Sequence, residues 1–298
     1  MKYKVIQRIY ILIFALGVFV LLPSCEKDVT DKFDLGTQNQ VVLQSFISPQ
    51  DSWVVVRLRR TQPAVGRRLS GEELKVKDAT VTMTDGNQTV TLPYEVKSDR
   101  YQVQASVFPI VAGKSYTVNV STASGSKLSA QTTVPLSAQI TIKSYSLKEK
   151  SQEFGGEYTS LTYKWSDAIG VENYYKTLAY RIASPAPGSS QIRREEFHNK
   201  EKSIDAFVSD ANSDGQELTS NELISPSRFS DDFPVPYKLH LSLLVIDKNY
   251  YLFQRSLLRQ NSSDDNPFAE PALIFSNVQG GLGIFASSNL VEEVKDVN

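Results

Sequence analysis

The chain of 298 residues is long enough for one large domain or two of ordinary size. Basic and acidic residues nearly balance, with a formal net charge of −1, which argues against nucleic acid as a partner. The single cysteine excludes a fold held together by disulfides, and 14 Phe and 14 Tyr beside many Val and Thr favour strands.

The chain begins with the order of a secretory signal peptide. A basic lead, a charge-free apolar run and a small residue follow one another in MKYKVIQRIYILIFALGVFVLLPS, directly before Cys25. The apolar run, Ile9–Leu22, is shorter than the roughly 20 residues that a membrane-spanning helix needs. We therefore expect residues 1–24 to be a signal peptide that is removed.

The end of this leader, Leu22-Pro23-Ser24-Cys25, resembles the lipobox of bacterial lipoproteins. The resemblance implies cleavage between Ser24 and Cys25 and acylation of Cys25, which would anchor the protein in membrane lipid. One acyl chain holds only marginally, at about 0.8 kcal/mol per buried methylene, so several chains on one residue make the attachment durable. The alternative is an ordinary secreted protein with an incidental Cys25; the absence of a second cysteine favours the anchor.

Residues 25–39 are polar and rich in acids, which predicts a lipidated, solvated tether between the membrane and the fold. Acids directly after a lipidated cysteine also resemble the surface-export signals of Bacteroidota lipoproteins. Both interpretations stay open at this point, and we expect the protein at the outer membrane, facing either the cell surface or the periplasm.

Residues 40–135 predict an immunoglobulin-like, antiparallel β-sandwich, because seven short extended segments alternate with turns. The expected strands are Val41–Ile47, Trp53–Leu58, Thr80–Thr84, Thr89–Leu92, Tyr101–Ala105, Ser115–Val120 and Lys127–Val134. Asp85-Gly86-Asn87 is a strong hairpin signal, since Gly86 readily takes a positive φ. The basic residues between Arg57 and Lys77 fit a solvated loop, offset by nearby acids, better than a site for acidic glycans or lipid headgroups.

Residues 136–298 predict a second β-rich domain with one amphipathic helix near 247–260. Strands are expected at Ala138–Ser146, Glu157–Trp165 and Tyr237–Asp247, and a further strand is expected to follow Gly170–Tyr175 and to end at Ile182. After Asp247, which can cap a helix start, Tyr250, Phe253 and Leu257 share one helical face opposite Arg255. The glycines of the tail, Gly280, Gly281 and Gly283, indicate a tight turn before a closing strand at Ile284–Phe285, and we favour structural closure over a ligand loop.

Catalytic constellations are absent from the sequence. The two histidines, His198 and His240, and one cysteine assigned to lipid do not make a zinc site, and His240 fits a strand residue better than a general base. Gly280-Gly281-Leu282-Gly283 does not open a helix after a strand, so a phosphate cradle is not expected. The sequence therefore predicts neither catalytic residues nor a cofactor.

One loop has the spacing of a calcium site. Asp210, Asn212 and Asp214 place oxygen-bearing side chains at alternate positions, and Gly215 holds the sixth place of such a loop. The twelfth place, which should supply a bidentate carboxylate, is Asn221, with Glu222 one residue late. We therefore interpret the segment as a polar turn and keep its three oxygen-bearing residues as the calcium candidate.

The tail also carries a family resemblance. Asn266-Pro267-Phe268-Ala269-Glu270-Pro271, then Ser276-Asn277-Val278 and Gly280-Gly281-Leu282-Gly283-Ile284-Phe285, resemble the hallmark of Bacteroidota lipoproteins filed as domain of unknown function 4249. Asp78-Ala79-Thr80-Val81 and Asn173-Tyr174-Tyr175 resemble further elements of that family. The resemblance implies an outer-membrane lipoprotein, often encoded beside a TonB-dependent β-barrel transporter, and it implies no catalytic residues.

Three functions follow as hypotheses. The first is a non-enzymatic accessory or ligand-binding partner of such a transporter, anchored through Cys25. The second is a surface hydrolase for glycans or peptides with a site formed from dispersed acids such as Asp231, Asp232 and Asp264. The third is a structural or adhesive surface lipoprotein. The lipid anchor and the missing catalytic constellation favour the first.

Overall fold

The computed structural model describes residues 40–63, 66–153, 156–183, 192–200, 207–226, 236–264 and 273–298. The predicted signal peptide, Cys25, the tether and the motif at Asn266–Pro271 lie outside the described residues. All strands and the helix belong to one compact unit, residues 39–62 and 69–298. The other unit, residues 1–38 and 63–68, is described only at 63 and 66–68, where the Arg67 guanidinium donates to the Arg68 carbonyl.

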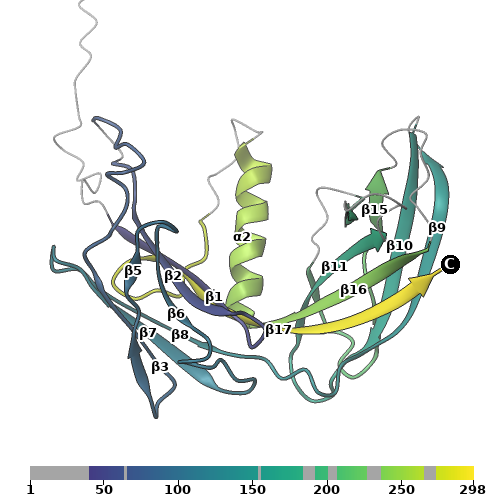
Figure 1. Ribbon diagram of the computed structural model, residues 1–298, viewed down its shortest axis with the longest axis horizontal. Coiled ribbons are helices and arrows are strands. Elements are labelled where there is room, and N and C mark those ends of the chain that lie inside the picture. The colour runs from purple at the N-terminus through teal and green to yellow at the C-terminus, as the bar shows by residue number, and fades with distance from the viewer. Residues whose placement is uncertain are drawn as a thin grey trace, which may run out of the picture. The chain divides into compact units, whose positions relative to one another are not determined.

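The chain is mainly β, with one helix among the described residues, as the sequence predicted (Figure 1). Residues 40–135 form β1 (Val41–Ile47), β2 (Trp53–Arg60), β3 (Thr80–Thr84), β4 (Thr89–Thr91), β5 (Tyr94–Glu95), β6 (Arg100–Gln104), β7 (Ser115–Ser121) and β8 (Lys127–Thr133). All but β5 lie within two residues of a predicted strand. A strand as short as β5 leaves no alternation in the sequence, so the pattern missed it.

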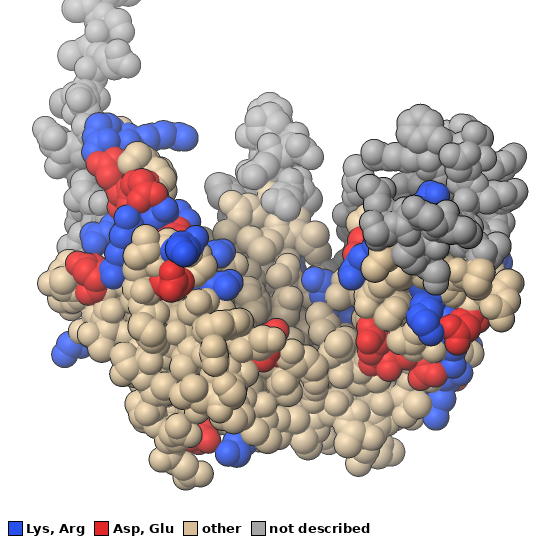
Figure 2. All heavy atoms as spheres, viewed as in Figure 1, with Lys and Arg blue, Asp and Glu red and all other residues tan. Residues whose placement is uncertain are grey.

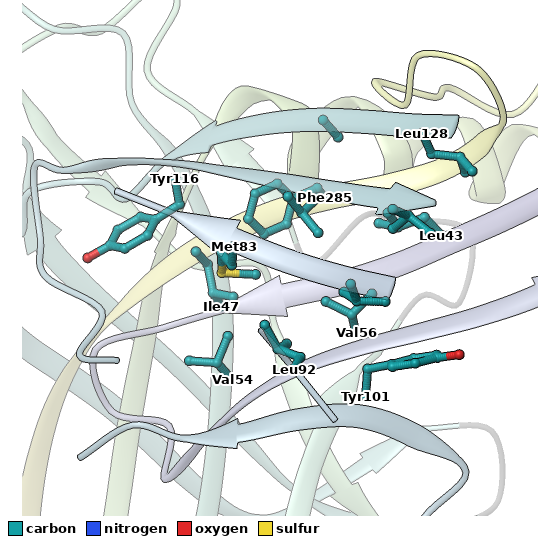
Figure 3. Close-up of a cluster of buried hydrophobic side chains, with 14 of the residues drawn as sticks. Leu43, Ile47, Val54, Val56, Met83, Leu92, Tyr101, Tyr116, Leu128 and Phe285 are labelled. Atoms are coloured by element: carbon teal, nitrogen blue, oxygen red, sulfur yellow. The ribbon is translucent and has the colours of Figure 1, made fainter. Parts of the chain in front are cut away.

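Two sheets enclose the first hydrophobic core. One is a separate four-stranded sheet in the order β4-β3-β7-β8, and β1, β2 and β6 belong to a larger sheet. Met83 and Tyr116 from the first sheet and Leu43 and Val56 from the second are fully buried in this core. Figure 3 shows Phe285, from the far end of the chain, within the same cluster.

The last strand, β17 (Leu282–Val297), connects the two halves of the chain. Residues 282–287 pair in parallel with β1, and residues 288–297 pair antiparallel with β16 (Tyr237–Ile246). The larger sheet therefore runs without a break in the order β14-β10-β15-β12-β11-β16-β17-β1-β2-β6-β5. The sequence predicted a short closing strand at Ile284–Phe285, and the observed strand is longer. Pairing among the strands of residues 40–135 is antiparallel as predicted. The parallel pair with β17 was not predicted, because local sequence does not encode which distant strand is the partner.

The second half contributes β9 (Thr141–Glu153), β10 (Gly156–Ser166), β11 (Tyr174–Ala183), β12 (Arg193–Asn199), β13 (Phe207–Ser209), β14 (Glu217–Thr219) and β15 (Leu223–Pro226). The sequence predicted β9, β10, β11 and β16 but missed the four strands from β12 to β15. Of these, β12 is mostly charged and exposed, and the others are only three or four residues long. None of them therefore has the apolar alternation that marks a half-buried strand.

A second hydrophobic core lies in this half. It collects buried side chains from residues 140–245, among them Tyr163, Trp165 and Tyr175. The first core takes its residues from 41–134 together with Val278 and Phe285. The tail of the chain thus returns to complete the first core.

The helix α2 (Lys248–Asp264) lies where the sequence predicted it and runs four residues further. Asp247 caps its start, since its carboxylate accepts from the backbone N–H of Tyr250 at 2.9 Å. Phe46 of β1 packs on this helix, with its ring centroid 4.8 Å from Tyr250 and 6.3 Å from Phe253. Among the described residues, no helix combines the length and apolar content needed to cross a bilayer.

Three glycines allow the tail to approach neighbouring backbone. A Cβ on Gly283 would lie 1.9 Å from the Leu43 carbonyl oxygen of β1, and one on Gly280 would lie 2.0 Å from the Lys127 carbonyl oxygen of β8. Both have positive φ, 119° and 75°, a region that L side chains rarely adopt. The predicted turn and structural closure are confirmed, and the close contact explains why side chains are absent there.

The side chain of Asn277 forms hydrogen bonds with the backbone of the closing strand. Its amide nitrogen donates to the Phe285 carbonyl at 2.7 Å, and its amide oxygen accepts from the Phe285 N–H at 3.0 Å. The same nitrogen lies 3.2 Å from the Gln131 carbonyl of β8. Two residues further along the chain, Gln279 forms an isolated β-bridge with Ser129 of β8. The segment therefore bonds to β8 on one side and to β17 on the other.

We predict that Gly283→Ala destabilises the protein by about 3 kcal/mol or more, because the added Cβ meets backbone and the positive φ is strained. Gly86→Ala is the matched control, since Gly86 has φ 91° but open space around its Cβ position. Gly86→Ala should lower the free energy of unfolding only through the strained positive φ, by about 1–2 kcal/mol. Chemical denaturation measures both values. Equal losses for the two variants would contradict the close contact with β1.

Candidate functional site

Two loops of the second half are joined by hydrogen bonds that involve their backbones and their carboxylates. One connects β10 to β11 (residues 167–173), and the other connects β13 to β14 (residues 210–216). Asp210 accepts from the Asn173 N–H at 2.9 Å, and its own N–H donates to the Asn173 carbonyl at 3.3 Å. Asp214 accepts from the Gly170 N–H at 2.8 Å. The loops therefore hold each other in place.

Three carboxylates gather where these loops meet. One oxygen each of Asp167, Asp210 and Asp214 lies within 4.8 Å of the other two. Asp210 and Asp167 are buried, with 1% and 7% of their surface exposed, whereas Asp214 is exposed. Clusters of carboxylate oxygens are the ligands that hard divalent cations prefer.

The hydrogen bonds of the cluster are unevenly distributed. Asp167 accepts from the Gly215 N–H at 2.8 Å, from the Tyr175 hydroxyl and from the Asn173 amide at 3.3 Å. Asp210 Oδ1 is buried and has no hydrogen-bond partner. Burial, together with the neighbouring charge of Asp167, raises the pKa of the Asp210 carboxyl. Burial and the bond to Asp167 raise the pKa of the Tyr175 hydroxyl.

The sequence found part of this group. It identified Asp210 and Asp214, which the structure brings together, and Asn212, which is exposed on the same loop. It missed Asp167, because that residue comes from a loop more than 40 positions earlier; its partner Gly215 is 48 positions away. The only local signal was an acid followed by glycine in Asp167-Ala168-Ile169-Gly170, which is common in turns.

A partly buried carboxylate elsewhere, that of Asp247, has a structural role. Asp247 accepts from the Thr132 hydroxyl of β8 at 2.6 Å and from the Ser287 N–H of β17 at 3.3 Å, besides capping α2. Burial raises the pKa of this carboxyl, and the donors Thr132, Tyr250 and Ser287 oppose that rise. The group joins β8, β17 and the helix start, which is a structural role.

A buried ion pair also has structural partners. The Arg181 guanidinium of β11 is 3.2 Å from Glu195 of β12 and lies over the rings of Phe197 and Tyr237, at 5.7 and 5.5 Å. Glu195 also accepts from the Ser225 hydroxyl of β15. These contacts connect β11, β12 and β15, and the sequence did not anticipate them because the three strands are far apart along the chain.

The histidines and the acids proposed for a hydrolase are not assembled into a site in the described part of the chain. His240 stacks on Tyr180 with centroids 4.3 Å apart, and its Nδ1 is 3.3 Å from Glu292, as fits the predicted strand residue. His198 is exposed on β12. Asp231 and Asp232 lie outside the described residues, and Asp264 is the last residue of α2.

Three of the basic residues on and after β2 are paired with acids. Arg59 is 2.6 Å from Asp99, Lys77 is 2.8 Å from Glu72, and Lys75 also pairs with Glu72. Figure 2 shows positive and negative side chains interspersed on the face in view. Glu72 offsets the positive charge of the loop, as the sequence predicted. The pairing of Arg59 with Asp99 was not predicted.

In the described ranges, the fold and these contacts define a β-rich protein with two hydrophobic cores and one carboxylate cluster in its loops. A family model described as a domain of unknown function (DUF4249) matches residues 26–293, and the chain belongs to that family. The comparison with curated proteins found no match.

We predict that Asp247→Ala lowers the free energy of unfolding by about 2–4 kcal/mol. Loss of the helix cap contributes roughly 1 kcal/mol, and the Ser287 N–H left without its side-chain acceptor contributes about 1–3 kcal/mol. The Thr132 hydroxyl keeps the Ser287 hydroxyl as a partner at 2.8 Å. Asp247→Asn keeps an acceptor and should lose less. Asp296→Ala, which removes an exposed pair with Lys238, should change stability by no more than about 0.5 kcal/mol. Similar denaturation midpoints for Asp247→Ala and Asp296→Ala would contradict the assigned role.

Proposed function

We propose that the protein is a lipoprotein anchored at the outer membrane through an acylated Cys25. In this proposal it is a non-enzymatic accessory or ligand-binding partner of a TonB-dependent transporter. The observation that carries it is the leader: a basic lead and a short apolar run end in Ser24 directly before the single cysteine. The family match begins at residue 26, immediately after that cysteine, so the leader lies outside the family domain.

The anchor suits the body that follows it. Residues 25–39 are polar enough to act as a solvated tether, and the β-rich body begins with β1 at Val41. A protein held by acyl chains on one terminal residue presents its whole folded body to the medium or to a neighbouring protein. The resemblance to Bacteroidota lipoproteins adds the outer membrane and the transporter to the proposal.

The contacts of Asp247, Arg181 and Glu195 support a binding or accessory role. Asp247 joins β8, β17 and α2, and Arg181 with Glu195 joins strands of the second half. Each of these groups is used to hold elements together. The proposed activity is therefore recognition of a ligand or a partner surface rather than a reaction.

We predict that labelled palmitate appears on the wild-type protein and that Cys25→Ser removes the label and releases the protein from the membrane fraction. The reason is that the thiol is the attachment point for acyl chains, several of which are needed for durable binding. Ser24→Ala is the matched control, because it keeps a small residue before the cysteine and should still be labelled. A Cys25→Ser protein that matures and localises unchanged would overturn the anchor.

Docking on a transporter has its own test. A tagged protein solubilised in mild detergent should retain a β-barrel partner, identified by mass spectrometry, while the Cys25→Ser form should retain less of it because it no longer concentrates at the membrane. Repeated recovery of the wild-type protein without any β-barrel partner would argue against docking and leave the lipid anchor standing.

A further inference from the structure

The carboxylate cluster carries negative charge that the described protein does not neutralise. Asp167, Asp210 and Asp214 lie together, and in the described part of the chain none of them forms a salt bridge. Burying an unpaired charge is costly, so such a group is normally paired, protonated or bound to a metal. Asp210 is the sharpest case, because it is 1% exposed and its Oδ1 has no hydrogen-bond partner.

The second loop has the backbone of a cation-binding turn. Asp210, Asn212 and Asp214 alternate, and Gly215 at the sixth place has φ 70°, as the sharp turn of a calcium loop requires. Its flanking elements are the strands β13 and β14, not helices. The resemblance is therefore confined to the loop itself.

The missing twelfth ligand is replaced from outside the loop. Glu222, the nearest acid to that place, accepts from the Ser160 hydroxyl at 2.6 Å and pairs with Lys200 at 3.1 Å. Asp167 instead brings its carboxylate to the loop from the β10–β11 connection, where it also accepts from the Gly215 N–H. The sequence lacks the twelfth-place carboxylate of a calcium loop, which argued against a calcium site. In the folded protein, Asp167 brings a carboxylate to the loop instead.

We propose that these two loops form a Ca²⁺ site, with carboxylate ligands from Asp167, Asp210 and Asp214. The amide oxygen of Asn212, which is exposed on the same loop, and water complete the shell. The site is separate from the lipid anchor and does not depend on the proposed function.

The chemistry of the site favours calcium over other cations. All three carboxylate ligands are hard oxygens, and the group contains neither histidine nor cysteine, which zinc and copper prefer. Ca–O bonds of about 2.3–2.6 Å place opposite ligands roughly 4.6–5.2 Å apart, which accommodates oxygens up to 4.8 Å from one another. Magnesium demands shorter bonds and a near-ideal octahedron, and it retains its water more strongly.

A bound cation would tie β10 and β11 to β13 and β14. Neutralising the carboxylates removes their mutual repulsion, so the folded state should gain stability from calcium by mass action. With few ligands and an exposed Asp214, we expect a dissociation constant on the order of 10⁻⁴–10⁻³ M, the range of extracellular calcium modules.

Calorimetry and thermal unfolding of the chelator-treated, purified full chain test the site. Addition of 10 mM CaCl2 should give binding heat and raise Tm by about 3–6 °C, and the chelator EGTA should reverse the rise. The same concentration of MgCl2 should raise Tm less. Wild-type protein that shows neither heat nor a Tm change with calcium overturns the proposal; Asp210 would then be satisfied by a proton shared with Asp167.

Terbium provides a readout specific to this place. Tyr175 bonds to Asp167, and Trp165 lies 5.3 Å from Tyr175 between ring centroids, so Tb³⁺ at the site should show luminescence sensitised by these rings. Calcium should displace that luminescence. Sensitised emission that persists at saturating calcium would place terbium elsewhere and count against the site.

Three variants complete the test. Asp214→Asn changes an exposed side chain and should weaken calcium binding at least tenfold with the fold intact, and Asp210→Asn should abolish the calcium-dependent rise in Tm. Asp85→Asn is the matched control, because Asp85 also precedes a positive-φ glycine but pairs with Lys114 rather than with other carboxylates. It should keep the full calcium response. An Asp214→Asn protein that binds calcium like Asp85→Asn would overturn the assignment.

Discussion

The structure depends on one close approach, where the tail's backbone lies against β1 and β8. Glycine at 280 and 283 leaves no Cβ between the tail and the carbonyls of Lys127 and Leu43, so the parallel pair of β1 and β17 can form. Phe285 then enters the first core, where it is fully buried. A buried Phe is worth roughly 1.5–3 kcal/mol, so the first half of the chain gains part of its core from residues near the other end.

The same strand joins the two halves through a partly buried carboxylate, that of Asp247. Where β17 leaves β1 and pairs with β16, Asp247 accepts from Ser287, from Thr132 of β8 and from the first turn of α2. The Asp247 carboxylate thus caps the start of α2 and also binds β8 and β17 where the strands meet. Its donors compensate its burial, as buried polar groups require.

Asp210 presents the contrasting case, and the contrast separates a structural carboxylate from a candidate ligand. Asp247 has several donors around it, whereas Asp210 has a buried oxygen without a partner and faces two further carboxylates. The cluster lies in loops between strands, where binding residues commonly gather on a rigid scaffold.

Local sequence was enough to predict most strands of the first half, the cap at Asp247, the helix after it and the turn at the tail glycines. Each of these is encoded by neighbours within a few residues, through alternation, helical spacing or a capping side chain. Only the tertiary structure decided that β17 pairs with both β1 and β16, that Asn277 holds Phe285, and that Asp167 joins Asp210 and Asp214. These contacts join residues far apart in the chain, and no local pattern specifies which distant backbone or carboxylate will be the partner.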